Sequence, residues 1–251
     1  MRRQKEINDR IIRESKLLRT DGALEQWQTP RGLFWTPTKS RYGLHFHLAE
    51  QERKIYFNGE HTIKKGDIVL DCGANIGPFT RVALDAGASK VIAVEPAPEN
   101  LECLRRSFKD EIASGRVVLY PKGVWHKDDM LTMIIDETNS AADSFVMKPK
   151  GSTATTFKLP LTTIDKLVAE LKLPRVDFVK MDIEGSETNA LTGARGTLTK
   201  HHPRLSVCVY HRADHPESVP KAIRAAAPYE SECGPCNVDN GRIHPQIFYF
   251  H

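Results

Sequence analysis

The 251-residue sequence has no long hydrophobic run. A membrane-spanning helix needs ~20 consecutive apolar residues, and neither such a run nor the hydrophobic core of a signal peptide is found. We therefore expect no membrane insertion and no classical secretion. Hydrophobic residues make up 40% of the chain and charged residues 27%, which is typical of a folded globular protein and argues against extended disorder.

Cysteine is also scarce, with five residues in the whole chain. An odd number of cysteines without regular spacing does not provide a disulfide framework. Because no export signal accompanies them, we expect reduced thiols and a cytoplasmic location.

Excess charge is confined to the N-terminus. Residues 1–20 contain seven basic and three acidic side chains, which accounts for the whole net charge of +4. A nucleic-acid-binding protein usually spreads its bases over a whole face, so we interpret the segment as a solvated charged helix and do not expect a nucleic-acid partner. The interspersed acids also argue against an organelle transit peptide.

Two regions are expected from the pattern along the chain. Residues 1–60 form an N-terminal appendage with a charged helix to about Arg19, then a loop and short strands, in which Trp27, Phe34 and Trp35 pack onto a neighbouring surface. Residues 61–251 form the main domain.

The main domain alternates short apolar runs, typical of buried strands, with helical spacing of apolar residues. Such repeated units predict one α/β domain with a doubly wound, mostly parallel sheet and helices on both faces. Thr162 and Asp165 resemble a capping box at a helix start. We expect strands at 68–70, 91–94, 117–120, 131–135, 176–181 and 205–209, and an antiparallel pair of 229–233 with 246–250.

The loop after the first of these strands carries the most information. It reads Asp71-Cys72-Gly73-Ala74-Asn75-Ile76-Gly77 and precedes an amphipathic helix, at the edge where open α/β sheets bind ligands. Glu95 ends the next strand, at the position where an acidic residue commonly accepts hydrogen bonds from ribose hydroxyls.

The glycine spacing separates classes of nucleotide. A dinucleotide site uses G-x-G-x-x-G to cradle a pyrophosphate, whereas Gly73 and Gly77 are separated by three residues and follow Asp71. A carboxylate there repels a phosphate but suits a ligand with an ammonium group. S-adenosylmethionine has an ammonium group, a ribose and no phosphate.

These motifs, together with residues 179–185 (Val-Lys-Met-Asp-Ile-Glu-Gly) and 209–212 (Val-Tyr-His-Arg), resemble the FkbM-type family of class I S-adenosylmethionine-dependent methyltransferases. The resemblance spans about Thr29 to Phe250. It implies a Rossmann-like seven-stranded sheet whose last strand is antiparallel, S-adenosyl-L-methionine as cofactor, and O-methylation of a sugar or natural-product hydroxyl. The cofactor-binding residues that it implies are Asp71, Gly73, Ala74, Asn75, Gly77, Glu95, Pro96, Gly123, Val124 and Asp182.

Three side chains directly after parallel strands are candidates for catalysis. Asp182 and Glu184 follow the fourth parallel strand and His211 follows the fifth. The family pattern places Asp182 near the methionine end of the cofactor and Glu184 toward the acceptor. Histidine titrates near neutrality, so we expect His211 to be the general base. The same three types can ligate a divalent metal, but we expect no metal.

Other segments have open interpretations. Trp125 either stacks on the adenine or packs in the core, and the loop Asn139 to Ser144 either borders the acceptor or is a solvated connection. Cys233-Gly234-Pro235-Cys236 spells a thioredoxin motif, but it follows the sixth strand, so we do not expect redox catalysis. It is an incidental turn, an acceptor contact or half of a zinc site.

Two other functional classes compete with methyl transfer. One is a nicotinamide-dependent oxidoreductase on a similar sheet, and the other is a non-catalytic domain that binds the cofactor without turnover. The acceptor, a small molecule or glycan, is not identified by the sequence, and a homodimer is left open, because such properties depend on loops.

Overall fold

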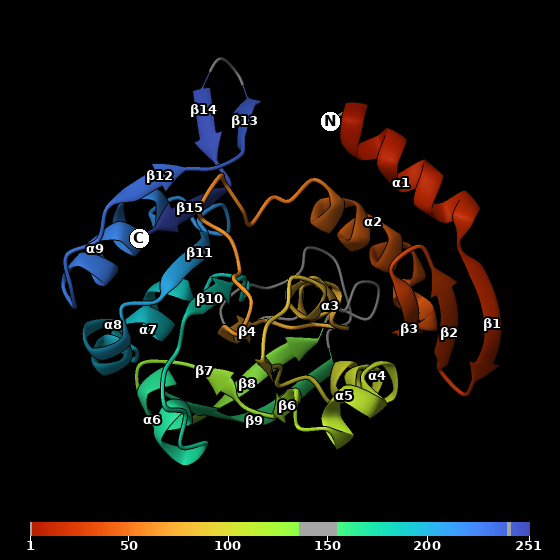
Figure 1. Ribbon diagram of the computed structural model, residues 1–251, viewed down its shortest axis with the longest axis horizontal. Helices are drawn as coiled ribbons and strands as arrows, with labels where there is room; N and C mark the ends of the chain where they lie inside the picture. The colour runs from red at the N-terminus through yellow and green to blue at the C-terminus, as the bar shows by residue number, and fades with distance from the viewer. Residues whose placement is uncertain (1, 136–154, 240–241) are drawn as a thin grey trace.

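The computed structural model describes residues 2–135, 155–239 and 242–251. Its centre is a seven-stranded sheet in the order β12-β15-β11-β10-β4-β5-β6 (Figure 1). Five strands are parallel, as predicted from the alternating pattern. Their bounds are β4 Ile68–Cys72, β5 Lys90–Val94, β6 Val117–Tyr120, β10 Phe178–Met181 and β11 Arg204–Cys208.

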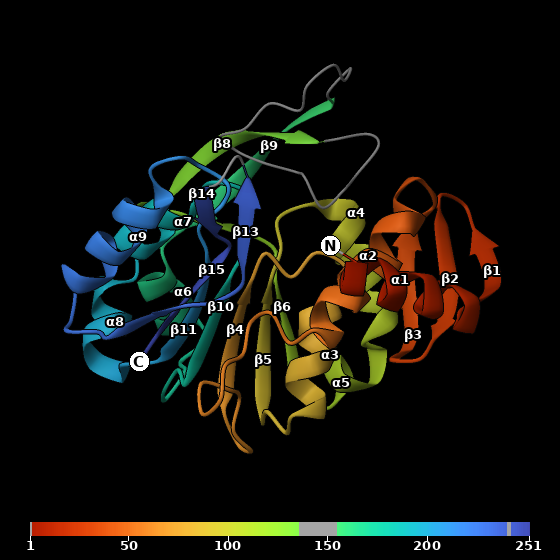
Figure 2. The same ribbon diagram turned by 90° about the horizontal axis from the view of Figure 1, so that it is seen from above.

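Helices cover both faces of this sheet (Figure 2). Neighbouring residues of a strand point to opposite faces, so Val69 packs in the core on the α3 side and Leu70 in the core on the α6 side. One layer contains α3 (Pro78–Asp85), α4 (Pro98–Ser107) and α5 (Lys109–Ala113). The other contains α6 (Ile164–Glu170), α7 (Glu187–Thr192), α8 (Arg195–His201) and α9 (His215–Arg224).

The predicted antiparallel pair at the C-terminus is confirmed. β15 (Ile247–Phe250) runs antiparallel to both β11 and β12 (Ser231–Cys233). A small hairpin that was not predicted, β13 (Cys236–Asp239) and β14 (Arg242–Pro245), is inserted between them and extends from the sheet (Figure 1).

A separate three-stranded sheet lies between β6 and α6 in the chain. Its order is β7-β9-β8, with β7 at Gly123–Val124, β8 at Asp129–Ile135 and β9 at Thr155–Thr162. β8 confirms the strand expected at 131–135, whereas β9 was not among the expected strands.

The N-terminal region differs in part from the prediction. The helix α1 (Arg2–Glu14) ends before Arg19, and the short strands expected after it form a three-stranded antiparallel sheet. Phe34 and Trp35 are almost fully buried and Trp35 N–H donates to Ser107 Oγ of α4 (2.8 Å), so the expected packing onto a neighbour is confirmed for these two. The additional elements are β1 (Lys16–Asp21), β2 (Leu24–Thr29), β3 (Gly32–Pro37), the 3-10 turn Thr38–Ser40 and α2 (Arg41–Glu52).

The start of α6 is displaced by one residue from the predicted capping box. Thr163, not Thr162, is the N-cap, and its hydroxyl accepts the Lys166 N–H. Thr162 donates instead to Asp128, and Asp165 accepts N–H groups at the start of α8.

No helix of the described residues has the length and apolar character needed to cross a membrane.

Candidate active site

The glycine loop after β4 touches the loop after β10 through the backbone. Gly73 has φ +80°, and a Cβ there would lie 1.9 Å from the carbonyl oxygen of Asp182. The Asp182 N–H donates to the Cys72 carbonyl oxygen (3.1 Å). Only glycine allows this contact, so the predicted cofactor loop and the first predicted catalytic residue form one rigid unit.

The far end of the same loop is equally constrained. Gly77 has φ +94°, and a Cβ there would lie 2.3 Å from the ring of Phe108. Between the two glycines, Asn75 also has a positive φ of 51°. The predicted Gly73, Ala74, Asn75 and Gly77 therefore form a tight turn between β4 and α3.

Glu95 supports this turn from the end of β5. Its carboxylate accepts the backbone N–H groups of Asn75 (2.8 Å) and Ala97 (2.9 Å). Burial raises the pKa of Glu95, and these two hydrogen bonds act against the rise. Glu95 thus fixes the loop in the apoprotein, and its contact with ribose hydroxyls stays a prediction.

Asp71 lies in a different environment from the one that the sequence reasoning assumed. Its side chain is fully buried, with Lys180 Nζ 3.2 Å from Oδ1 and Thr80 Oγ1 donating to Oδ2 (2.7 Å). Burial acts to lower the pKa of Lys180, but the charges of Asp71 and Asp182 outweigh it and the pKa is raised. Lys180 also donates to the Gly73 carbonyl oxygen (2.7 Å), so this pair braces the glycine loop, and a direct contact of Asp71 with a cofactor stays a prediction.

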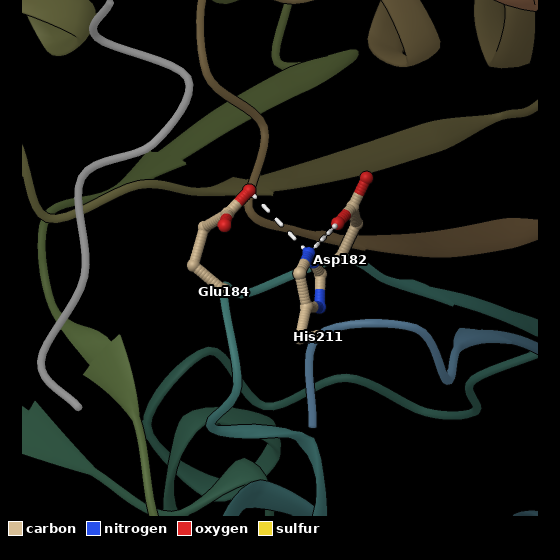
Figure 3. A group of neighbouring side chains, drawn as sticks. All are labelled: Asp182, Glu184 and His211. Atoms are coloured by element: carbon tan, nitrogen blue, oxygen red, sulfur yellow. Dashed lines mark ion pairs between the residues drawn. The ribbon is translucent and has the colours of Figure 1, made fainter. Parts of the chain in front are cut away.

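The three predicted catalytic side chains meet at the carboxyl edge of the sheet, where parallel strands β10 and β11 end. His211 Nε2 lies 3.3 Å from Asp182 Oδ1 and 3.5 Å from Glu184 Oε1. Figure 3 shows both carboxylates pointing toward this ring nitrogen from the loop after β10. Glu184 reaches this position with a left-handed φ of 51°.

Further side chains hold the outer atoms of this group. Glu187 Oε1 lies 2.8 Å from His211 Nδ1 and also accepts the Ile183 N–H (3.0 Å). Tyr56, from the segment after α2, donates its hydroxyl to Asp182 Oδ2 (2.7 Å). The sequence reasoning missed Glu187 and Tyr56, although Glu187 follows Glu184 by three residues, a spacing that suggests a shared site.

The electrostatics of His211 differ from the expectation for a free general base. Burial acts to lower the pKa of His211, but Glu184 and Glu187 outweigh it and the pKa lies well above its usual value. Burial raises the pKa of Glu184, whereas the charges of Lys180 and His211 outweigh burial at Asp182 and lower the pKa there. The carboxylates around His211 therefore favour its protonated form over the neutral one.

A cleft connects this group to the glycine loop. Its lining combines loop residues with one wall contributed by α2. No helix was predicted at the position of α2, so the wall that it forms was not expected. Leu44 and Leu48 are four residues apart, which is about one helical turn, and both are buried; this apolar spacing is the sequence signal for the helix. The α2 wall contains Phe46, His47, Glu50 and Gln51, and the opposite side contains Gly73, Ala74, Asn75, Lys180, Asp182, Glu184 and Tyr210.

Four other residues considered for cofactor binding are not among the described residues that line this cleft: Pro96, Gly123, Val124 and Trp125. Gly123 and Val124 form β7 and are buried, and Trp125 is a buried residue, with 8% of its surface exposed. Pro96 follows Glu95 without lining the cleft. The contacts of Pro96, Gly123 and Val124 with a cofactor stay predictions. The loop Asn139 to Ser144 lies outside the described residues.

The two cysteines of the Cys-x-x-Cys motif lie side by side at the end of β12. Their Sγ atoms are 3.3 Å apart, and both residues are exposed, free thiols. Within residues 2–135, 155–239 and 242–251, the group of acidic, histidine or cysteine side chains close enough to share a metal is Asp182, Glu184 and His211, not this pair.

Comparison with known proteins agrees with this architecture. The sequence is 26% identical over 166 residues to the 31-O-demethyl-FK506 methyltransferase FkbM of Streptomyces tacrolimicus, covering 56% of this chain and 64% of the relative. It is 25% identical over 170 residues to the hexuronic acid methyltransferase AglP of Haloferax volcanii, covering 65% of this chain and 64% of the relative. The matches thus span a little under two thirds of each curated relative.

A crystal structure of the methyltransferase FkbM from Methylobacillus flagellatus has the same fold. The TM-score is 0.53 at 18% identity, and the match covers 99% of this chain and 59% of that one. The sequence model of the methyltransferase FkbM domain matches residues 71–234, from the glycine loop to the Cys-x-x-Cys motif. The chain therefore belongs to the FkbM methyltransferase domain family.

Proposed function

We propose that the protein is an S-adenosylmethionine-dependent methyltransferase that methylates a hydroxyl group of a small molecule, sugar or natural product. The observation that carries this proposal is the cleft in which the glycine loop faces the Asp182, Glu184 and His211 group. It brings a nucleoside-type loop and a set of proton-accepting side chains to the same edge of the sheet. The two curated relatives are named as a 31-O-demethyl-FK506 methyltransferase and a hexuronic acid methyltransferase, and these names support an oxygen acceptor.

The reaction requires alignment and removal of one proton. The acceptor oxygen attacks the methyl carbon in line with the sulfonium, so a C–O bond forms as the C–S bond breaks. S-adenosylhomocysteine leaves as a neutral thioether, and the hydroxyl proton must pass to a base or to water. The enzyme gains most by holding the two reactants in register, which the shared backbone contact of Gly73 and Asp182 supports.

The roles of the three side chains follow from their positions. Asp182 is in backbone contact with the glycine loop, so we assign it to the cofactor side, and we assign Glu184, which lines the same cleft, to the acceptor side. His211 is behind both, with 2% of its side chain exposed. We assign Asp182, Glu184 and His211 jointly to the catalytic group and Gly73, Ala74, Asn75, Gly77 and Glu95 to the cofactor.

The nicotinamide alternative has less support. The family match is to methyltransferases, and the loop offers no third glycine for a pyrophosphate. A protein that binds the cofactor without turnover is separated from an enzyme by product formation.

Calorimetric titration of S-adenosylmethionine and, separately, of NADH into the full chain tests the proposal. We expect a dissociation constant on the order of micromolar for the sulfonium ligand, weakened in Glu95→Ala. Glu99→Gln is the matched control, because Glu99 lies nearby on α4 and pairs with Lys39 at the surface. Binding of NADH in preference to the sulfonium ligand would overturn the proposal.

A further inference from the structure

The catalytic group has the geometry of a cation site. Asp182 Oδ1, Glu184 Oε1 and His211 Nε2 all lie within 4.8 Å of one another, and the imidazole nitrogen is 3.3 and 3.5 Å from the two oxygens. Ligands about 2.1 Å from an octahedral cation are about 3 Å apart when adjacent and about 4.2 Å when opposite. The three atoms can therefore reach one cation with small side-chain adjustments (Figure 3).

The partners of the outer atoms form a second, independent observation. His211 Nδ1 is bound to Glu187, and Asp182 Oδ2 accepts the Tyr56 hydroxyl. Among the described residues, the inner atoms His211 Nε2 and Asp182 Oδ1 have no hydrogen-bond partner, and the His211 side chain is 98% buried. A histidine held by a carboxylate through one nitrogen, with the other directed at further ligands, is the usual arrangement around a protein-bound metal.

Charge also favours a dication. Three carboxylates (Asp182, Glu184 and Glu187) lie around the His211 imidazole, and Glu187 also lies 3.5 Å from Nδ1 of the buried His215; the positive charge of Lys180 is 3.2 Å from Asp71 and also acts on Asp182. Several buried carboxylates without matching positive charge are unfavourable. A divalent cation would compensate two of the three negative charges.

We propose that Asp182, Glu184 and His211 bind a divalent cation of the Mg²⁺ or Mn²⁺ class. Two carboxylates favour these cations, and the single imidazole favours Mn²⁺ within the class. This departs from the sequence-based expectation that the site holds no metal.

The place of the cation in the reaction rests on the proposed function. Asp182 and Glu184 are 21% and 22% exposed and line the cleft, whereas His211 is on the closed side. The remaining coordination positions therefore face the space between the glycine loop and α2. An acceptor hydroxyl bound there loses its proton to water more readily, and the resulting oxygen is directed at the methyl carbon. Acceptors with two neighbouring oxygens, such as vicinal diols or hydroxy acids, gain most from this arrangement.

Electron paramagnetic resonance of Mn²⁺ with the EDTA-treated full chain tests the site without requiring an acceptor. We expect one Mn²⁺ per chain, displaced by Mg²⁺, with hyperfine coupling from an imidazole nitrogen. Asp182→Asn and Glu184→Gln should abolish binding, and Glu187→Gln, which removes a positioning residue, should weaken it roughly 10- to 100-fold. Glu50→Gln is the matched control, because Glu50 lines the same cleft but pairs with His47.

The outcomes separate this proposal from the proposed function. In the unmodified chain, either the absence of stoichiometric Mn²⁺ binding or bound Mn²⁺ without nitrogen coupling overturns the cation site. This test does not depend on whether the variants fold. Circular dichroism of each variant establishes folding. If the chain binds S-adenosylmethionine but not Mn²⁺, the cation site is wrong and the proposed function stands. If it binds Mn²⁺ but not S-adenosylmethionine, the cation site stands and the proposed function is wrong.

Discussion

Two groups of buried charges lie next to each other at the carboxyl edge of the sheet, and they differ in how completely they are paired. The Asp71 and Lys180 pair is closed, which means that both side chains are buried and paired with each other. Thr80 donates a further hydrogen bond to Asp71, and the Gly73 carbonyl oxygen accepts one from Lys180. The Asp182, Glu184 and His211 group has more negative than positive charge and opens into the cleft. Lys180 and Asp182 are two residues apart, so burial alone does not separate a structural charge from a functional one. The degree of pairing does.

The largest expected effect comes from breaking the closed pair. Lys180→Met leaves Asp71 buried without a counter-charge, and we expect a loss of about 3–5 kcal/mol in the free energy of unfolding. Urea unfolding measures it. The double variant Asp71→Asn/Lys180→Met should recover most of the loss, whereas Lys39→Met, which breaks the partly exposed pair with Glu99, should cost no more than about 1 kcal/mol. Equal losses for Lys180→Met and Lys39→Met would contradict the comparison.

A third buried group, His61, sharpens the comparison because the charged side chains that act on it within the described residues, Arg204 and His251, are both basic. Burial, reinforced by the positive charge of Arg204, lowers the pKa of His61 from 6.5 to about 4. Below pH 6.5 the unfolded chain binds a proton that the folded chain does not, so stability decreases as the pH falls to about 4, by at most about 3 kcal/mol.

Urea unfolding across this pH range checks the prediction for His61. The variant His61→Gln, which can keep the hydrogen bond to Ser206, should show a flatter pH dependence than the wild type. His126→Gln, at an exposed histidine, is the control and should leave the dependence unchanged. A His61→Gln profile that follows the wild type would show that His61 is not the group responsible.

Removing one hydrogen bond from the open group should have a smaller effect. Tyr56→Phe takes away the donor to Asp182 Oδ2, and hydrogen bonds to charged groups contribute about 1.5–3 kcal/mol. Tyr249→Phe removes the hydroxyl of another buried tyrosine, which donates to the Ile55 carbonyl oxygen, and about 0.5–1.5 kcal/mol is expected for its loss. Thermal and urea unfolding of both variants measure the difference between the two losses in unfolding free energy. A larger loss for Tyr249→Phe would mean that the hydrogen bond to Asp182 is not the stronger of the two.

The smallest expected effect on stability is at Glu184, a residue that we propose for catalysis. Glu184→Gln removes one ion pair with His211 but also relieves repulsion with Asp182 and Glu187, so unfolding should change by no more than about 1 kcal/mol. Methyl transfer should fall steeply in the same variant, which an assay of S-adenosylhomocysteine release measures once an acceptor is found. A destabilisation as large as that of Lys180→Met would place Glu184 among the structural charges.

The sequence predicted those parts of the molecule that depend on local pattern. The buried parallel strands, the glycine turn and the antiparallel C-terminal pair each have a periodicity or a residue spacing of their own, and all are found. The convergence of Asp182, Glu184 and His211 followed from their positions after neighbouring strands, because parallel strands end at one edge.

The missed parts depend on contacts between distant segments. The sheet of β1, β2 and β3 is stabilised where Trp35 meets Ser107, 72 residues away. In the sequence Lys180 is one residue of a predicted strand, and only the fold shows that it pairs with Asp71. The contact of Glu187 with His211 depends on a turn with a positive φ at Glu184, which the sequence pattern does not predict. The one-residue shift of the α6 cap follows from Asp128, which binds Thr162 across the sheet.

The separation of the cleft walls has a consequence for how such a protein diversifies. The wall with the glycine loop and the carboxylates is locked through backbone contacts at Gly73, so most changes there disturb cofactor and chemistry together. The opposite wall is one side of α2, where Phe46 is partly exposed and His47 and Glu50 pair only with each other among the contacts described. On the proposed function, substitutions at these three positions are the economical route to a different acceptor.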